Sequence, residues 1–211
     1  MRRFKLWASA LLILAVAAAG VWALWNFELR WRPNTITRHQ AQIVQLLQSA
    51  GWVSPGRKSK VLYIVTSPGC AACDRFTTEQ LPDLQAAGIE TRVIVVARRD
   101  LNGRVQSTPA DRATVAQLWL TRDWRLLQTW QAAPAGAWKA PGVPPADGDL
   151  ARMAVVEGAR GMVDKLTPLL RANGVRFAYP TLVWWNAKGE MRACACQRPE
   201  SDRFVRRELG I

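Results

Sequence analysis

The four cysteines of this 211-residue chain form two closely spaced pairs, Cys70 with Cys73 and Cys194 with Cys196. Small secreted domains that depend on disulfides for stability carry cysteines at a much higher density. Thiols separated by one or two residues are more typical of redox chemistry or metal binding. The spacing therefore indicates chemistry at these positions, and the elements around each pair decide which chemistry is available.

The residues around Cys70 predict that it begins a helix directly after a strand. Val61–Val65 is an apolar run of the length of a buried strand, and the polar residues 66–69 interrupt it. A helix N-terminus carries unpaired N–H groups and a partial positive charge, which stabilise a thiolate there. We therefore expect Cys70 to be the nucleophile and Cys73, one turn later, to close the disulfide.

The two residues between these cysteines are alanines, Ala71 and Ala72. Neither side chain carries a charge or a hydrogen-bond donor, so the thiolate is expected to depend on the helix terminus and backbone N–H groups alone. Two other roles remain compatible with a lone Cys-x-x-Cys pair. It can form a structural disulfide, or it can supply half of a zinc site.

Hydrophobic periodicity and turn residues predict alternating strands and helices along the rest of the chain. Strands are expected at Val61–Val65, Thr91–Ala97, Thr181–Trp185 and Glu190–Cys194. Helices are expected at Thr35–Ala50, Ala71–Ala87 with a kink or break at Pro82, Pro109–Gln131, Asp149–Asn173 and Glu200–Leu209. The apolar stripe of the first helix, Ile36 to Leu47, can pack either on the domain or on a second chain.

The N-terminal segment predicts a membrane anchor. An uncharged apolar run, Leu6–Trp25, follows Arg2, Arg3 and Lys5, and twenty helical residues match a hydrocarbon core about 30 Å thick. The basic residues should remain in the cytoplasm, which places the following chain outside the cytoplasmic membrane. The alternative is a signal peptide cleaved near Ala17–Ala19, which would release a soluble periplasmic protein.

The net charge of +13 is spread along the chain and has no nucleic-acid-binding motif beside it. We therefore expect no nucleic-acid partner and interpret the charge as solvated surface with some attraction to a membrane. The one histidine, His39, is far from the cysteines in sequence, which argues against Cys–His catalysis. We expect neither a cofactor nor a bound metal.

Two motifs, Ser67–Cys73 and Tyr179–Thr181, together resemble those of the thioredoxin superfamily, in which an x-Pro-Thr element with a cis proline faces the Cys-x-x-Cys pair. The order of elements is most similar to the catalytic domain of periplasmic disulfide isomerases of the DsbC and DsbG type. Those proteins also carry a helical insertion before the proline, here residues 105–173, and a Gln-x-Pro stretch after the last strand, here Gln197–Pro199. The resemblance covers residues 60–208.

The resemblance implies an α/β thioredoxin-like fold, with a mixed four-stranded sheet flanked by helices and a helical insertion before the cis proline. It implies that Cys70 is the nucleophile, that Cys73 resolves the mixed disulfide, and that Tyr179, Pro180 and Thr181 bind the polypeptide substrate. Three features differ from the family. Tyr179 is larger than the residue usual at its position. Residues 26–59 stand where those isomerases carry a dimerisation domain, and the pair at 194 and 196 has no counterpart.

The topology of such a sheet predicts that Cys194 and Cys196 lie near Cys70, because the last strand returns antiparallel to the edge where Pro180 begins the third strand. Two residues apart in a regular strand, their side chains are about 6.7 Å apart, too far for a disulfide. A bond between them requires a bulge or a bend at the strand end. The pair can be a second redox couple, a static disulfide, or part of a four-cysteine metal site.

The sequence thus predicts a membrane anchor (residues 1–25), a juxtamembrane helix and linker (26–59) and a thioredoxin-like domain (60–211). The expected function is that of a membrane-tethered thiol–disulfide oxidoreductase or isomerase in the periplasm, single-pass in the cytoplasmic membrane. Its expected partners are exported polypeptides and a membrane redox partner protein. The alternative is a non-enzymatic scaffold that keeps the fold and uses its cysteines for structure or metal.

Overall fold

The structure is a computed structural model that describes residues 2–56, 60–134 and 136–211, with the backbone alone for residues 2–12. The chain separates into two compact units, one ending at Arg32 and the other spanning Pro33–Ile211. Residues 57–59, which belong to the predicted linker, lie outside the described residues. The second unit therefore includes the helix that the sequence placed in the juxtamembrane segment.

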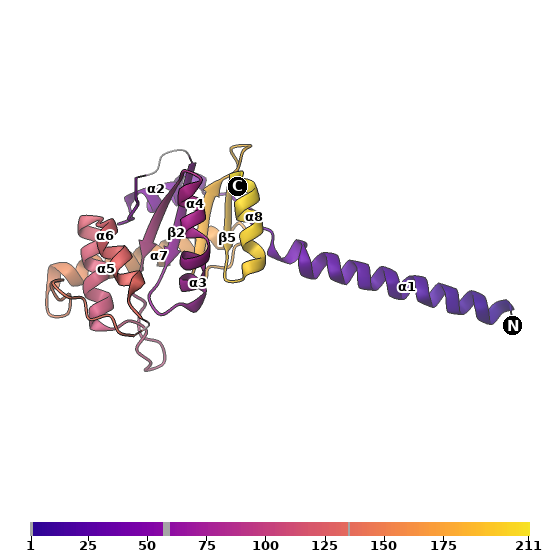
Figure 1. The fold of residues 1–211 in the computed structure, drawn as a ribbon, viewed down its shortest axis with the longest axis horizontal. Coiled ribbons are helices and arrows are strands. Elements are labelled where there is room, and N and C mark those ends of the chain that lie inside the picture. Colours follow the sequence, from indigo (N-terminus) through magenta and orange to yellow (C-terminus); the bar gives the residue numbers. More distant parts are fainter. Residues whose placement is uncertain (1, 57–59, 135) are drawn as a thin grey trace. The chain divides into compact units, whose positions relative to one another are not determined.

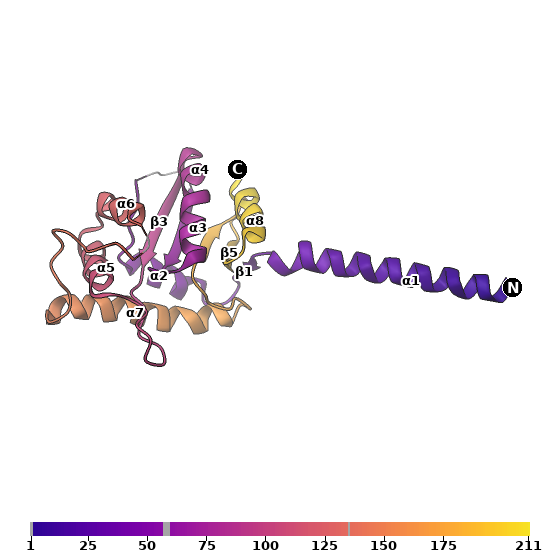
Figure 2. The same ribbon diagram turned by 60° about the horizontal axis from the view of Figure 1, so that its bottom comes forward.

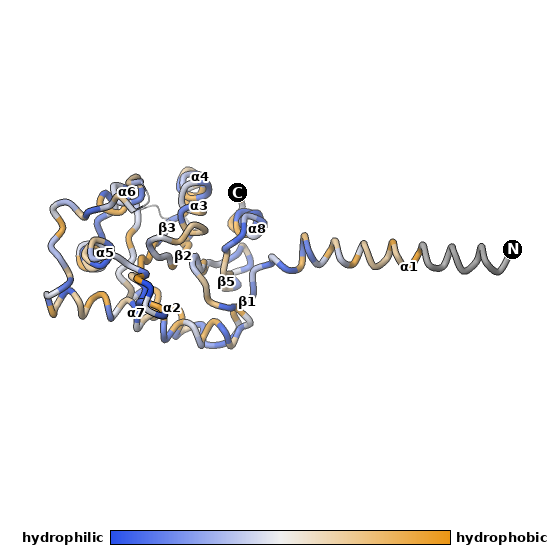
Figure 3. Tube along the Cα trace, turned by 90° about the horizontal axis from the view of Figure 1, so that it is seen from below, coloured by the Kyte–Doolittle hydropathy of each residue, from blue (hydrophilic) through white to orange (hydrophobic). Residues whose placement is uncertain are grey.

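The first unit is a long apolar helix, α1 (Arg2–Phe27), followed by a 3-10 turn, η1 (Leu29–Trp31). Within the described residues, this is the one helix long and apolar enough to cross a membrane, over the span Ile13–Trp31. Large apolar side chains such as Ile13 and Val21 are more than half exposed, and the coloured part of α1 is mostly white to orange in Figure 3. The helix fits a membrane anchor or a signal sequence, as predicted.

The second unit is built on a mixed sheet (Figure 1), and its strand order is β1-β5-β4-β2-β3. Its strands are β1 (Asn34–Thr35), β2 (Lys60–Thr66), β3 (Ile89–Val95), β4 (Thr181–Trp185) and β5 (Met191–Ala195). β2 and β3 are parallel, and the other neighbours are antiparallel. The four predicted strands are all present; β4 has the predicted ends, and the ends of the other three differ by one or two residues.

The prediction of four strands was wrong by one, because β1 adds a fifth. Asn34 pairs with Ala193 and Thr35 with Arg192, and the Ile36 N–H donates to the Met191 carbonyl over 2.8 Å. These bonds pair the edge of β5 that would otherwise be open. A strand of two residues has no measurable period, so the sequence indicated a helix from Thr35 instead.

The helices of the second unit follow the predicted order. They are α2 (Gln40–Ser49), α3 (Ala71–Glu79), α4 (Leu81–Ala86), α5 (Pro109–Thr121), α6 (Trp124–Ala132), α7 (Leu150–Arg171) and α8 (Pro199–Leu209). Pro82 lies in the first turn of α4 and separates it from α3, as expected. The single helix predicted over 109–131 is two helices instead. Arg122 ends α5 in the left-handed conformation, and the Asp123 carboxylate caps α6.

Helices cover both faces of the sheet (Figure 2). On one face, α3, α4 and α8 enclose a core that includes Phe76, Trp184 and Val205. On the other face, α2 and α7 pack together against the sheet. Ile36, Ile43 and Leu47 are fully buried in this second core, so the apolar stripe of α2 packs on the domain itself.

Candidate active site

The Cys70–Cys73 pair sits where strand β2 has ended and α3 begins. Cys70 is the N-cap of α3 in an extended conformation, and its carbonyl accepts the N–H groups of Cys73 over 2.8 Å and Asp74 over 3.0 Å. The two cysteines form a disulfide with their Cα atoms 5.2 Å apart. Cys70 is half-buried and Cys73 is buried. Cys70 is therefore the more exposed residue of the pair.

The helix terminus also contacts the Cys70 sulfur directly. The N–H of Cys73 donates to Sγ of Cys70 over 3.2 Å. Such a bond stabilises a thiolate on Cys70 when the disulfide is reduced, because the donor belongs to the positive end of the helix. Attack on a disulfide requires this thiolate form.

The turn before β4 faces the same sulfur. The Tyr179–Pro180 peptide is cis, as expected, and the Tyr179 carbonyl oxygen lies 3.5 Å from Sγ of Cys70. The Thr181 hydroxyl donates to the Ala178 carbonyl over 2.6 Å and ties the turn together. The structure thus brings Tyr179, Pro180 and Thr181 beside the redox pair. Their role in binding a polypeptide remains a prediction.

Cys194 and Cys196 form a second disulfide, with their Cα atoms 5.2 Å apart. β5 ends at Ala195, and the Gln197 N–H donates back to the Ala195 carbonyl over 2.9 Å, which is the bend that the sequence required. Both sulfur-bearing residues are buried. No group of three or more His, Cys, Asp or Glu side chains arranged to hold a metal ion occurs in the described parts of the chain.

The second disulfide is linked to the cis-proline turn by hydrogen bonds. The Cys196 N–H donates to the Pro180 carbonyl over 3.0 Å, and the Gln197 side-chain amide donates to the Tyr179 carbonyl over 3.4 Å. The Tyr179 carbonyl therefore contacts both the Cys70 sulfur and the Gln197 side chain. The predicted return of β5 to this edge is confirmed.

No family model and no curated protein matches the sequence. Among solved structures, Salmonella enterica Typhimurium BcfH superposes with a TM-score of 0.50 at 13% identity, over 98% of this chain and 93% of that one. Chlamydia trachomatis DsbA matches with a TM-score of 0.39 at 15% identity, over 76% of this chain and 90% of that one. The fold is thioredoxin-like. The predicted fold class is confirmed, including the helical insertion, which is α5 to α7.

Arg98 is a functional candidate that the sequence did not indicate, and the structure places it beside the loop before Cys70. Arg98 donates from Nη2 to the Pro68 carbonyl over 3.3 Å, and the same nitrogen lies 3.9 Å from where a Cβ on Gly69 would be. Arg160 in turn donates to the Arg98 carbonyl over 3.1 Å. A guanidinium therefore adjoins the loop that leads into Cys70. Because β2 and β3 are parallel, their carboxyl ends meet at one edge of the sheet. The predicted order of strand, helix and strand could therefore have indicated that Arg98 lies near Cys70.

Arg98→Gln is expected to slow alkylation of reduced Cys70 by iodoacetamide at pH 7 roughly three- to tenfold, because the loss of a nearby cation lowers the thiolate fraction. Arg98→Lys should react at nearly the wild-type rate, since it keeps the charge. Arg99→Gln is the matched control, because Arg99 pairs with Glu157 and Asp164. Equal rates for Arg98→Gln and the wild type across pH would contradict an electrostatic role.

The Tyr179 phenol is a further titrating group near the site. Burial raises its pKa to about 12, although the nearby Arg98 charge opposes the shift. Its ring packs edge-on against Phe177, with ring centroids 5.1 Å apart. The phenol thus stays neutral at physiological pH, and the part of Tyr179 that faces Cys70 is its carbonyl.

This burial predicts a loss of stability in alkali. Below pH 10 the phenol is protonated in both states, whereas between pH 10 and 12 the unfolded chain releases the proton that the folded one retains. The free energy of unfolding should therefore fall by up to about 2 kcal/mol as pH rises through this window. Denaturation of the wild type and Tyr179→Phe from pH 9 to 11.5 measures it, and an equal fall in both would refute the assignment.

Proposed function

We propose that this protein is a thiol–disulfide oxidoreductase that acts on exported polypeptides through Cys70 and Cys73. One observation carries the proposal: a half-buried Cys70 at a helix N-cap, bonded to a buried Cys73 and facing a cis-proline turn. In the reduced state the Cys70 thiolate attacks a client disulfide, forms a mixed disulfide and expels one client thiolate. The Cys73 thiolate then attacks Sγ of Cys70 and releases the second client thiolate.

Two electrons pass from the Cys70–Cys73 pair to the client in this sequence, and the reverse sequence oxidises a client dithiol. In isomerisation, the released client thiolate attacks another disulfide of the same polypeptide before Cys73 acts. The similarity of element order to DsbC and DsbG favours a reductase or isomerase. Tyr179, Pro180 and Thr181 would bind the client backbone beside Cys70, and the Tyr179 carbonyl lies 3.5 Å from its sulfur.

We further propose that α1 anchors the chain in the cytoplasmic membrane and leaves the thioredoxin-like domain in the periplasm. Arg2, Arg3 and Lys5 precede the apolar run, and basic residues favour the cytoplasmic side. A periplasmic location supplies the oxidising surroundings in which cysteine pairs cycle. A membrane redox protein would then renew the Cys70–Cys73 pair. If α1 were cleaved as a signal peptide, the domain would be soluble in the periplasm.

The deciding experiment is the reduction potential of Cys70–Cys73 in the full chain, measured by thiol trapping in glutathione buffers in detergent. A couple that titrates reversibly supports an oxidoreductase, and its value separates a reductant from an oxidant. If the pair stays oxidised at every ratio of reduced to oxidised glutathione, the result supports the non-enzymatic scaffold instead. The same conclusion follows if the thiols react only after a chelator is added. A shifted potential in Cys194→Ala/Cys196→Ala would couple the second disulfide to the site.

A further inference from the structure

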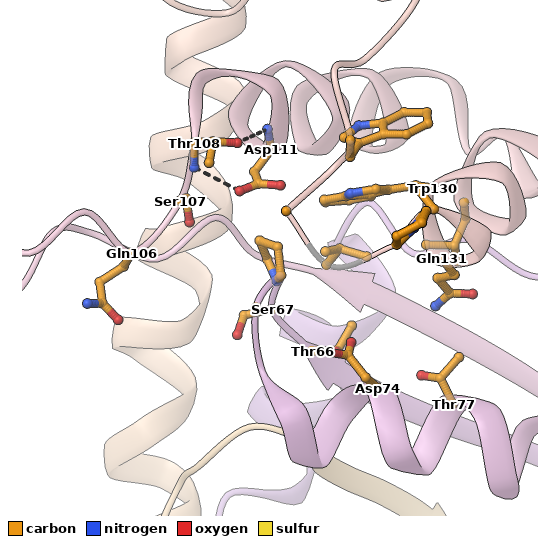
Figure 4. A pocket seen from close by; sticks show the side chains of 18 of the residues that line it. Thr66, Ser67, Asp74, Thr77, Gln106, Ser107, Thr108, Asp111, Trp130 and Gln131 are labelled. Atoms are coloured by element: carbon orange, nitrogen blue, oxygen red, sulfur yellow. Dashed lines mark hydrogen bonds between the residues drawn. The ribbon is translucent and has the colours of Figure 1, made fainter.

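A cavity of about 480 Å³ opens between the loop that precedes Cys70 and the helical insertion (Figure 4). Its walls are the loop of residues 66–69, the part of α3 that carries Asp74 and Thr77, the loop of residues 105–108, and the end of α6. A cavity of this size holds a large side chain with some backbone. Gly69 directly precedes Cys70 and Asp74 follows it by four residues, so the cavity adjoins the chain on both sides of the nucleophile.

The charges in this cavity are opposite to those of the whole protein. The chain has 29 basic and 16 acidic residues, yet the described lining residues include two carboxylates, Asp74 and Asp111, and no Lys, Arg or His. The Asp111 carboxylate accepts the Thr108 N–H over 2.7 Å and caps α5. Asp74 has no ion pair among the described residues, and its partial desolvation raises the pKa of its carboxyl. A cation beside Asp74 would relieve this unfavourable desolvation.

Aromatic rings form another wall of the cavity. Trp130 and Trp138 lie with ring centroids 6.3 Å apart and planes tilted by 30°, and the Trp138 indole is held by a 2.7 Å bond from its Nε1 to the Thr114 hydroxyl. The faces of such rings attract cations and pack against methylene chains. The combination of indoles and a carboxylate suits a long side chain that is apolar along its stem and positive at its end.

Two buried hydroxyls give independent evidence that the cavity binds a ligand. Ser67 and Ser107 both line the cavity, are 2% and 1% exposed, and have no hydrogen-bond partner for Oγ. Buried polar groups in folded proteins nearly always have partners, so two unpaired hydroxyls in the wall of one cavity indicate that a bound group supplies the missing bonds once the wall adjusts to it. Each can accept a bond from an N–H of such a group.

We propose that this cavity binds a lysine or arginine side chain of the client polypeptide, two or three residues from the cysteine that exchanges with Cys70. The inference rests on the proposed function and names its substrate class. Asp74 is one helical turn beyond Cys70, which is about 6 Å along the axis of α3. Two or three residues of an extended peptide span this distance. The stem packs on Trp130, and the cationic end meets Asp74.

The test uses the reduced full chain in detergent and peptides whose single cysteine is joined to 2-nitro-5-thiobenzoate. The Cys70 thiolate attacks the peptide sulfur, a Cys70–peptide disulfide forms, and the coloured thiolate leaves with the electron pair of the broken bond. Peptides with lysine at the second or third residue from the cysteine should react about fivefold faster than their norleucine analogues. Glutamate analogues should be slowest.

Asp74→Asn should bring the lysine-to-norleucine rate ratio close to one, and Trp130→Leu should lower it. Glu79→Gln is the matched control, because it removes one charge from the same helix outside the cavity lining and should keep the wild-type ratio. Any change in thiolate fraction caused by Asp74→Asn affects both peptides equally and cancels in the ratio. Equal rates for both peptides in the wild type, or an unchanged ratio in Asp74→Asn, would overturn the proposal.

Equilibrium binding separates failure of this inference from failure of the proposed function. Fluorescently labelled peptides with serine in place of cysteine cannot exchange, so their anisotropy reports binding without the reaction at Cys70. Tighter binding of the lysine peptide, lost in Asp74→Asn, supports the cavity even if no peptide reacts with Cys70. Reaction with peptides without any preference in rate or binding would retain the oxidoreductase and refute the cavity assignment.

Discussion

Cys70→Ser is expected to abolish thiol–disulfide exchange, whereas Cys73→Ser is expected to retain the first step and accumulate a mixed disulfide. The difference follows from their positions. Cys70 is half-buried at the N-cap of α3, where a client sulfur can reach it, and Cys73 is buried behind it. A serine at 70 leaves no accessible thiolate, because the remaining sulfur cannot meet a client in line. A serine at 73 leaves the nucleophile but removes the thiol that resolves the intermediate.

The measurement is reduction of a disulfide-bonded peptide, with products separated on non-reducing gels and by mass spectrometry. Wild type should turn over, Cys70→Ser should stay at the uncatalysed rate, and Cys73→Ser should retain one peptide per chain, released by added thiol. Cys194→Ser/Cys196→Ser is the control, because it removes the other disulfide and leaves Cys70 and Cys73 in place. A mixed disulfide on Cys73 in the Cys70→Ser variant would reverse the assigned roles and show that the buried sulfur is accessible.

The core of the site could be predicted because its signals are local. β2 is an unbroken run of strand-forming residues, Cys70 follows it after a short interruption, and β4 and β5 flank a turn at Lys188–Gly189. The bend that joins Cys194 to Cys196 followed from strand geometry alone. These elements fix the strand order around Pro180, and with it the fold class.

The features that were missed depend on contacts between distant residues. Arg98 follows Cys70 by 28 positions and reaches the active-site loop only through the parallel pairing of β2 and β3. β1 exists because its two residues complete the edge of β5, which no local period reveals. The sequence does contain a signal for the break between α5 and α6, because aspartate is a favoured N-cap residue and Asp123 caps α6. Apolar periodicity continued across it and suggested one helix instead.

Gly51→Ala is expected to lower the free energy of unfolding by about 3 kcal/mol or more, because the site has no space for a methyl group. A Cβ on Gly51 would lie 2.5 Å from both Cα and Cγ of Trp119 in α5. Neither the segment that carries Gly51 nor helix α5 can move away easily, because hydrogen bonds hold both. The Trp119 indole donates to the Val95 carbonyl over 2.8 Å, and Arg122 of the same helix donates to the Ala50 carbonyl over 3.2 Å. The substitution must therefore push α5 away from β3 or break these bonds.

Urea denaturation of the full chain, followed by tryptophan fluorescence, measures the effect. Gly158→Ala is the matched control, because Gly158 lies within α7 with nothing within 4 Å of the added Cβ. Alanine is the better helix former there, so this variant should be equal to the wild type or more stable by up to about 1 kcal/mol. Replacing Trp119 by leucine in the Gly51→Ala background should not restore stability, since the clash with its Cα is with the backbone of α5. Full recovery in that double variant would place the clash in the indole alone and require a different packing of α5 on the sheet.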